Sequence, residues 1–230
     1  GSFTSISEAQ SAMSWYGVSG TVYTASQYCV TVCRTTDGTI LFEFDCGRDQ
    51  NLAVSPQSSS GKAVTWFKGY QYYGDFEYVR RSGEKLTVIN IVDIEDYVKG
   101  VLPYEMSGSW PIEALKAQAL CARTYAASHF NANDYYGFDV TNDTYSQVYR
   151  GLNSATSTSD AAVDATAGIY ILYKGEPITA MYCSSNGGAT ENSENVMSSA
   201  VGYLRGKVDS FEAAAASINA NSSWTYTFTR

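Results

Sequence analysis

Glu105 is the residue whose setting in the sequence most favours acid–base chemistry. It stands in the run Leu102-Pro103-Tyr104-Glu105-Met106, shortly before Trp110. An apolar and aromatic environment disfavours the charged form of a carboxyl group, so Glu105 could keep a proton near neutral pH. A carboxylic acid of that kind can protonate the oxygen of a glycosidic bond. The alternative is an ordinary glutamate on a solvent-exposed loop.

A second candidate is a polar, glycine-containing loop that follows a predicted strand. It reads Ser184-Ser185-Asn186-Gly187-Gly188-Ala189-Thr190-Glu191. Its hydroxyls and backbone amides could contact a hydroxyl-rich ligand, although such loops are usually simple turns. The loop lacks the helix-opening pattern of a phosphate-binding loop. No Gly-x-Ser-x-Gly elbow surrounds its serines, and a serine hydrolase would have to use His129, the only histidine, as its base.

Two basic residues lie on the helix that we predict over residues 111–129. Arg123 stands beside Ala122 and Tyr125, where an unpaired guanidinium would be costly. We therefore expect Arg123 to bind either a protein carboxylate, as a structural ion pair, or a polar ligand. Lys116 lies seven residues earlier, on nearly the same face of the helix.

The composition excludes several classes of protein. The chain has 230 residues, of which 44% are hydrophobic and 17% charged, enough to bury a core. Its formal net charge is -8 and its longest basic run is Arg80-Arg81, so nucleic acid is not an expected partner. Nineteen tyrosines suit either a protein that handles sugars or β-sheets with one exposed face. No run approaches the roughly eighteen consecutive apolar residues that a membrane-spanning helix needs.

The five cysteines give no clear metal or catalytic pattern. Three of them lie close together in the sequence: Cys29, Cys33 and Cys46. One disulfide among these three is conceivable. With a single histidine and no second His/Cys pair, a structural zinc site is improbable. A thiol enzyme using Cys121 or Cys183 is a further alternative, but Cys121 and His129 are eight residues apart on one predicted helix, too far to touch.

Short runs of β-branched and aromatic residues predict strands in the first hundred residues. These runs are residues 22–23, 29–33, 40–44, 63–67, 70–80 and 86–92. Turn residues such as Asp37-Gly38 separate them, and the polar stretch 55–62 is expected to be a loop. Residues 1–62 are therefore expected to be strand-rich, and whether they form a separate β subdomain stays open.

The middle of the chain is predicted to be helical. A capped helix begins at Asp93, and Gly100 and Pro103 are expected to end it. Residues 111–129 form a second helix, rich in alanine, whose small side chains suit the centre of a domain.

The last third of the chain mixes both kinds of element. We expect a short helix over 160–167, a hairpin of strands 169–173 and 177–183, and a strand over 224–230 that stops abruptly. The predicted fold class is α+β, with strand-rich flanks around the central alanine-rich helix. A substrate groove is expected between that helix and the loop over 184–191.

Several of these segments together resemble the SpoIID/LytB family. They are Val88-Ile89-Asn90-Ile91-Val92-Asp93-Ile94-Glu95-Asp96-Tyr97-Val98-Lys99-Gly100-Val101-Leu102-Pro103-Tyr104-Glu105-Met106, residues 110–119 and 122–126, Ser146-Gln147-Val148-Tyr149-Arg150-Gly151, residues 165–168, the loop 184–191, and Tyr203-Leu204-Arg205. The segments run in the family's order from about residue 63 to the end. The first sixty residues match only loosely.

The resemblance implies a peptidoglycan lytic transglycosylase of the bacterial cell envelope. In sporulating bacteria the family works on glycan strands during engulfment, after an amidase has removed the stem peptides. Glu105 would be the catalytic acid. The residues that would line or support the groove and bind substrate are Lys116, Arg123, Gln147, Ser184, Ser185, Asn186, Gly187, Gly188, Tyr203 and Arg205. Some members hold zinc through a cysteine pair before Gln147, but residues 141–146 contain no cysteine, so we expect neither a metal nor another cofactor.

This reaction explains how a single carboxylate could suffice. A glycoside hydrolase normally uses two carboxylates. In a lytic transglycosylase one glutamate protonates the leaving oxygen and then, as a carboxylate, takes a proton from the sugar's own C6 hydroxyl, which closes a 1,6-anhydro ring. The nucleophile is intramolecular, so no second base has to hold a water molecule. The alternative is a non-catalytic glycan-binding module that stimulates a cell-wall amidase, which would then be a partner beside the glycan strands.

The resemblance also suggests boundaries and a location. Residues 63–230 would be the catalytic domain, with a C-terminus that we expect to be truncated, and residues 1–62 the N-terminal strand-rich segment. The Gly1-Ser2 start reads as a cloning remnant. We therefore expect the natural protein to be extracytoplasmic, secreted or anchored by an N-terminal segment that precedes these residues.

Overall fold

The computed structural model describes residues 3–81 and 85–218, which divide into two compact units. The first comprises the chain up to Tyr97 together with Gly151–Asn153, and the second comprises Val98–Arg150 and the residues from Ser154 onward. A domain boundary near residue 62 stays a prediction. The strand expected over 224–230 lies outside the described residues. No helix among the described residues is both long enough and apolar enough to cross a membrane.

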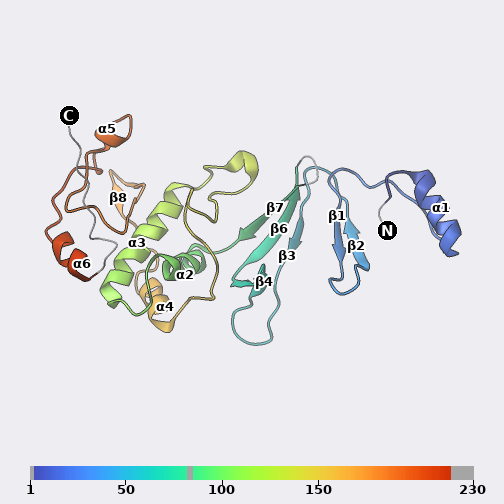
Figure 1. Ribbon diagram of the computed structural model, residues 1–230, viewed down its shortest axis with the longest axis horizontal. Coiled ribbons are helices and arrows are strands. Elements are labelled where there is room, and N and C mark those ends of the chain that lie inside the picture. The colour runs from blue at the N-terminus through green and yellow to red at the C-terminus, as the bar shows by residue number, and fades with distance from the viewer. Residues whose placement is uncertain (1–2, 82–84, 219–230) are drawn as a thin grey trace. The chain divides into compact units, whose positions relative to one another are not determined.

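The first unit begins with a helix where we predicted only strands. Helix α1 spans Ile6–Tyr16, ahead of a hairpin of β1 (Val30–Cys33) and β2 (Ile40–Phe44) (Figure 1). The side chain of Ser5 accepts a hydrogen bond of 3.1 Å from the backbone N–H of Glu8, which caps the first turn of α1. Serine followed three residues later by glutamate is a recognised helix-start signal, and our prediction overlooked it.

The first unit also contains a three-stranded antiparallel sheet in the order β3-β6-β7. Its strands are β3 (Leu52–Val54), β6 (Asp75–Arg80) and β7 (Leu86–Ile91). The strand predicted over 70–80 is divided, because β5 (Tyr70–Tyr72) pairs with β4 (Thr65–Phe67) instead. The division falls at Gly74, which has a φ of +80° and lies so close to Ile91 that a Cβ atom would stand 2.2 Å from the Ile91 carbonyl oxygen.

Helix α2 (Ile94–Glu105) continues past the point where we expected it to end. The backbone N–H of Glu95 donates to the Asp93 carboxylate at 2.9 Å, which caps the helix start as the sequence suggests. Pro103 lies inside the helix, so the predicted end at Gly100 and Pro103 is wrong. A proline removes only its own N–H donor, and the chain beyond it still closes a helical turn through the 2.9 Å bond from Met106 N–H to the Leu102 carbonyl.

The second unit is built around helix α3 (Ile112–Ser128), close to the predicted span. Leu115, Ala119 and Ala122 on α3 are fully buried. Helix α4 (Ser157–Asp164) packs against α3 and begins three residues earlier than predicted, since Thr156 and Ser159 form a capping box (Figure 1).

The remaining elements of the second unit are short. They are the 3₁₀ turn η1 (Asp134–Tyr136), the hairpin of β8 (Leu172–Tyr173) and β9 (Glu176–Pro177), α5 (Ser193–Val196) and α6 (Glu212–Ile218). The predicted hairpin is confirmed with shorter strands. Helices and small antiparallel sheets occur together, so the α+β fold class is confirmed, and the groove beside α3 stays a prediction.

Gly151 should be essential for stability. It has a φ of +67°, and a Cβ atom there would lie 2.0 Å from the Gln71 carbonyl oxygen, which accepts a 2.8 Å bond from Leu152 N–H. Gly168 has a similar φ of +71° but open space around it. We expect Gly168→Ala to lower the free energy of unfolding by about 1 kcal/mol through backbone strain. Gly151→Ala should cost about 1–3 kcal/mol more through the clash. Equal losses in denaturant unfolding would contradict this account.

Candidate active site

Glu105 is the last residue of α2 and is half-buried. Its carboxylate accepts a hydrogen bond from the hydroxyl of Tyr182. Tyr182 follows the β8–β9 hairpin and lies two residues before the polar loop that begins at Ser184. Because consecutive Cα atoms are about 3.8 Å apart, the start of that loop lies within about 8 Å of Tyr182. The Tyr182 side chain thus links the predicted acid to the segment that leads into the predicted binding loop.

The Tyr182 hydroxyl also accepts a hydrogen bond, from the side chain of Gln147. The Gln147 side chain is buried, with 2% of its surface exposed. The Nε2 atom donates to the Tyr182 hydroxyl at 3.2 Å and to the backbone carbonyl of Ala122 at 3.4 Å. Gln147 was predicted to bind substrate, and the structure places it behind Tyr182.

The environment of Tyr182 keeps its hydroxyl protonated. Its pKa is raised, first by burial and then by the charge and hydrogen bond of Glu105 and by Tyr125, while the hydrogen bond from Gln147 acts in the opposite direction. At neutral pH Tyr182 is therefore a neutral hydrogen-bond donor facing the carboxyl group of Glu105.

Arg123 is completely buried, and its guanidinium group contacts backbone carbonyls. Its Nη2 atom lies 3.3 Å from the Val163 carbonyl, and its Nη1 atom lies 3.4 Å from the Ile169 carbonyl. Both nitrogens also lie 3.4 Å from the hydroxyl of Thr166. These acceptors lie at the end of α4 and in the following turn, and the carboxylate or ligand partner stays a prediction. Arg123 therefore supports the fold beside the site.

Lys116 lies on α3 in an ion pair with Glu113, whose Oε1 atom is 2.8 Å from the lysine Nζ. The lysine side chain is 30% exposed and that of Glu113 is 79% exposed. An ion pair of this kind is weak, so it leaves the ammonium group able to exchange partners.

The polar loop is held in shape by side chains from the C-terminal part of the chain. The Ser185 hydroxyl donates to the Glu212 carboxylate, and the Asn186 Nδ2 atom donates to Asp209 at 2.9 Å. The Asn186 carbonyl oxygen accepts from the N–H of Gly188 at 2.9 Å. Gly187 and Gly188 both have positive φ, which explains the two glycines at this turn.

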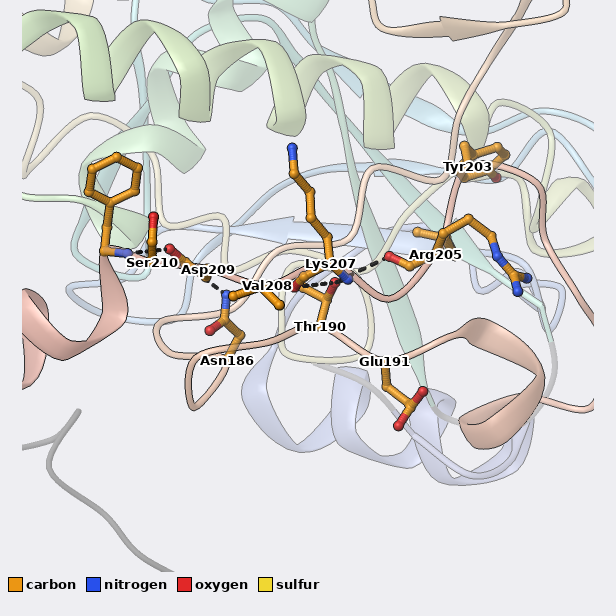
Figure 2. A pocket seen from close by; sticks show the side chains of 11 residues that line it. Asn186, Thr190, Glu191, Tyr203, Arg205, Lys207, Val208, Asp209 and Ser210 are labelled. Atoms are coloured by element: carbon orange, nitrogen blue, oxygen red, sulfur yellow. Dashed lines mark hydrogen bonds between the residues drawn. The ribbon is translucent and has the colours of Figure 1, made fainter.

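A pocket of about 550 Å³ lies next to this loop (Figure 2). Its lining residues are Asn186, Thr190, Glu191, Tyr203, Leu204, Arg205, Lys207, Val208, Asp209, Ser210 and Phe211. Two of them were predicted from the sequence outside the loop. Tyr203 accepts a 3.1 Å bond from the Thr179 N–H, and Arg205 forms two bonds of 2.7 Å with Glu194. Hydrogen bonds from Arg205 lower the pKa of Glu194, so this pair stays ionised near neutral pH.

The structure thus sorts the predicted residues into two groups. Glu105 and Gln147 meet around Tyr182, and Asn186, Tyr203 and Arg205 line the pocket. The sequence analysis did not single out Tyr182, although this residue lies in the strand predicted over 177–183, next to the loop. It also missed Asp209 and Glu212, which lie more than twenty residues from their partners and carry no signal in the sequence.

The structure gives little support to a catalytic cysteine or to a metal site. Burial raises the pKa of the Cys121 thiol, which disfavours the reactive thiolate. None of the five cysteines, all of which are among the described residues, forms a disulfide. Within residues 3–81 and 85–218 no group of three or more His, Cys, Asp or Glu side chains could hold a metal ion. The absence of zinc stays a prediction.

Comparison with known proteins identifies the central part of the chain. Residues 82–173 match the family described as SpoIID, Stage II sporulation protein. Residues 82–173 are thus similar to the SpoIID family. The match includes Glu105, Lys116, Arg123 and Gln147 but ends before Tyr182 and the polar loop. The resemblance noted in the sequence is confirmed.

Three relatives extend the comparison beyond the SpoIID match itself. The chain is 46% identical over 140 residues to an uncharacterized protein of Brachyspira hyodysenteriae, 47% identical over 112 residues to the Amidase enhancer of Bacillus subtilis, and 35% identical over 129 residues to Stage II sporulation protein D of Bacillus subtilis. These alignments cover 60%, 49% and 50% of this chain. They cover only 38%, 15% and 38% of the relatives' own lengths.

Arg123 and Lys116 of α3 should respond differently to the same substitution. Arg123→Met leaves buried carbonyl groups without their donor, so we expect the free energy of unfolding to fall by about 2–4 kcal/mol. Lys116→Met removes only an ion pair near the surface and should change it by less than about 1 kcal/mol. Denaturant unfolding measures both, and an equally small effect at Arg123 would contradict its supporting role.

Proposed function

We propose that this SpoIID-family domain is a peptidoglycan lytic transglycosylase of the cell envelope, acting outside the cytoplasm. It would cleave the MurNAc–GlcNAc bond of peptide-free glycan strands and leave 1,6-anhydro-MurNAc ends. The names of two relatives, a sporulation protein and an amidase enhancer, support a role at the cell wall. The observation that carries the proposal is the half-buried Glu105 at the end of α2, held by the neutral donor Tyr182.

The proposed reaction needs one carboxyl group. Glu105 in its acid form gives its proton to the glycosidic oxygen while the bond from that oxygen to C1 of MurNAc breaks. The resulting carboxylate takes the proton from the C6 hydroxyl, whose oxygen forms the new bond to C1. Glu105 regains its proton, no water is consumed, and the ring closes between two groups of the same sugar.

The other predicted residues would hold the glycan. Residues 184–188 follow Tyr182 closely in the chain, and their backbone and hydroxyl groups would bind sugar hydroxyls. Tyr203 and Arg205 line the neighbouring pocket, and Lys116 offers an ammonium group. Arg123 and Gln147 are buried, and their contribution would be to keep the site in shape.

A second candidate function is a non-catalytic glycan-binding module that stimulates a cell-wall amidase. The observation in its favour is the 47% identity to the Amidase enhancer of Bacillus subtilis. In that case the polar loop and pocket would bind glycan, and Glu105 would have no chemical role. A cell-wall amidase would then be the functional partner.

Replacing Glu105 separates the two functions. We expect Glu105→Gln to keep the fold and to abolish cleavage of purified peptide-free glycan strands, because an amide cannot donate a proton of suitable acidity. Mass spectrometry of the products should find 1,6-anhydro-MurNAc ends with the unmodified protein only. Glu113→Gln is the matched control, since Glu113 is an exposed glutamate on α3, and it should behave like the unmodified protein.

Other outcomes have defined meanings. Full activity of Glu105→Gln would refute the assignment of the acid. Products with reducing ends would mean hydrolysis and would require a second carboxylate. Glycan binding without any product, together with equal stimulation of an amidase by both proteins, would support the second candidate.

A further inference from the structure

We infer that Tyr182 is the positioning residue for Glu105, and that it is itself held by Gln147 from the backbone of α3. The inference rests on the proposed function, because it assigns a role within that reaction. It depends on a continuous series of contacts that joins α3 to the end of α2. Neither the family match, which ends at residue 173, nor the sequence motifs point to Tyr182.

The direction of the hydrogen bonds follows from one carbonyl group. The Ala122 carbonyl can only accept, so the side-chain atom of Gln147 that lies 3.4 Å from it must be the nitrogen. The same nitrogen lies 3.2 Å from the Tyr182 hydroxyl, whose oxygen therefore accepts from Gln147. A tyrosine hydroxyl has a single proton, and here that proton is left for the Glu105 carboxylate.

Hydrogen bonds to α3 and to Tyr203 hold the backbone of the segment that leads to Tyr182. The Ile171 N–H donates to the Thr124 hydroxyl of α3 at 3.0 Å, and Ile178 N–H donates to the Ile171 carbonyl at 3.1 Å. On the other side, the Thr179 N–H donates to the Tyr203 hydroxyl at 3.1 Å. The backbone three residues before Tyr182 is thus tied to α3 and to the pocket wall, which limits how far the hydroxyl can move.

This arrangement suits a group that must act first as an acid and then as a base. The Tyr182 hydroxyl occupies one oxygen of Glu105, so the proton to be transferred is carried by the other oxygen. When that proton leaves, Tyr182 already donates to the new carboxylate and stabilises its charge. Since Tyr182 stays protonated well above neutral pH, the donor is present throughout the cycle.

Kinetics of two single variants and the double variant test the inference. We expect Tyr182→Phe to lower kcat on peptide-free glycan about 10–100-fold with KM changed less than about threefold, because the lost bond acts on the reacting carboxyl group. Gln147→Met should lower kcat by about 3–10-fold, and the double variant should be no worse than Tyr182→Phe alone. Tyr145→Phe is the matched control, since Tyr145 is 90% exposed, and it should leave kcat unchanged.

An NMR measurement at neutral pH tests the contact without any activity. With ¹³C-labelled tyrosine, we expect Glu105→Gln to shift the ring resonances of Tyr182, because the group that accepts from its hydroxyl has changed from a carboxyl group to an amide. Tyr125, which also faces Tyr182, remains in place, and Glu113→Gln should have no effect. An unmoved Tyr182 signal in Glu105→Gln would overturn the inference.

The results distinguish the inference from the function on which it rests. Loss of activity in Glu105→Gln together with full kcat in a folded Tyr182→Phe would overturn the inference and leave the transglycosylase proposal intact. Additive effects of Tyr182→Phe and Gln147→Met would also overturn it, since a general loss of stability adds in that way. An unmodified protein that cleaves no glycan would end both proposals. Melting temperatures near that of the unmodified protein establish that each variant is folded.

Discussion

A fully buried guanidinium group constrains the whole second unit. Arg123 has no exposed surface, so its donors must be met by groups of the protein, and a shortfall would be costly. The carbonyls of Val163 and Ile169 and the hydroxyl of Thr166 are among the groups that accept from it. These acceptors lie at the end of α4 and in the next turn, so burying one arginine on α3 fixes where α4 ends and where the following hairpin begins.

The site inherits its geometry from that arrangement. Ala122 and Thr124 flank Arg123 on α3, and both bind the segments that reach the site. The Ala122 carbonyl orients Gln147, and the Thr124 hydroxyl holds the backbone of Ile171 at the start of the hairpin. Three consecutive residues of one helix thus place α4, Gln147 and the chain that carries Tyr182. A rigid helix used in this way gives the reacting carboxyl group a defined position, which loops alone could not provide.

The sequence predicted the parts of this structure that depend on local patterns. The span of α3 and the hairpin near residue 175 follow from alanine content, turn residues and alternation, and the structure agrees with both. Glu105 was found because its neighbours are apolar and aromatic. The error at Pro103 arose from treating proline as a helix end, whereas the helix loses only one hydrogen bond there. Helix α1 was missed although Ser5 and Glu8 have the spacing of a capping box.

Contacts between distant residues could not be predicted in the same way. Tyr182 reads as one more tyrosine in a strand, and its importance comes from Glu105 and Gln147, which lie 77 and 35 residues earlier in the chain. The contacts of the Arg123 guanidinium with the Val163 and Ile169 carbonyls could not be predicted either, because the pattern of side-chain types does not show which backbone carbonyls lie nearby. Long-range partners of this kind are set by tertiary packing, about which a single sequence carries no direct information.

The polar loop shows how satisfied side chains can still form a binding surface. Ser185 and Asn186 donate hydrogen bonds to Glu212 and Asp209. Because these bonds already order the turn, a ligand that binds there pays less conformational entropy. Ser184 and Gly187 remain exposed at the same turn. In a ligand rich in hydroxyl groups, backbone N–H and C=O groups of such a turn can be recognised as well as side chains. Selection of a sugar at this loop would therefore depend on the shape fixed by Glu212 and Asp209, more than on the identity of any one serine.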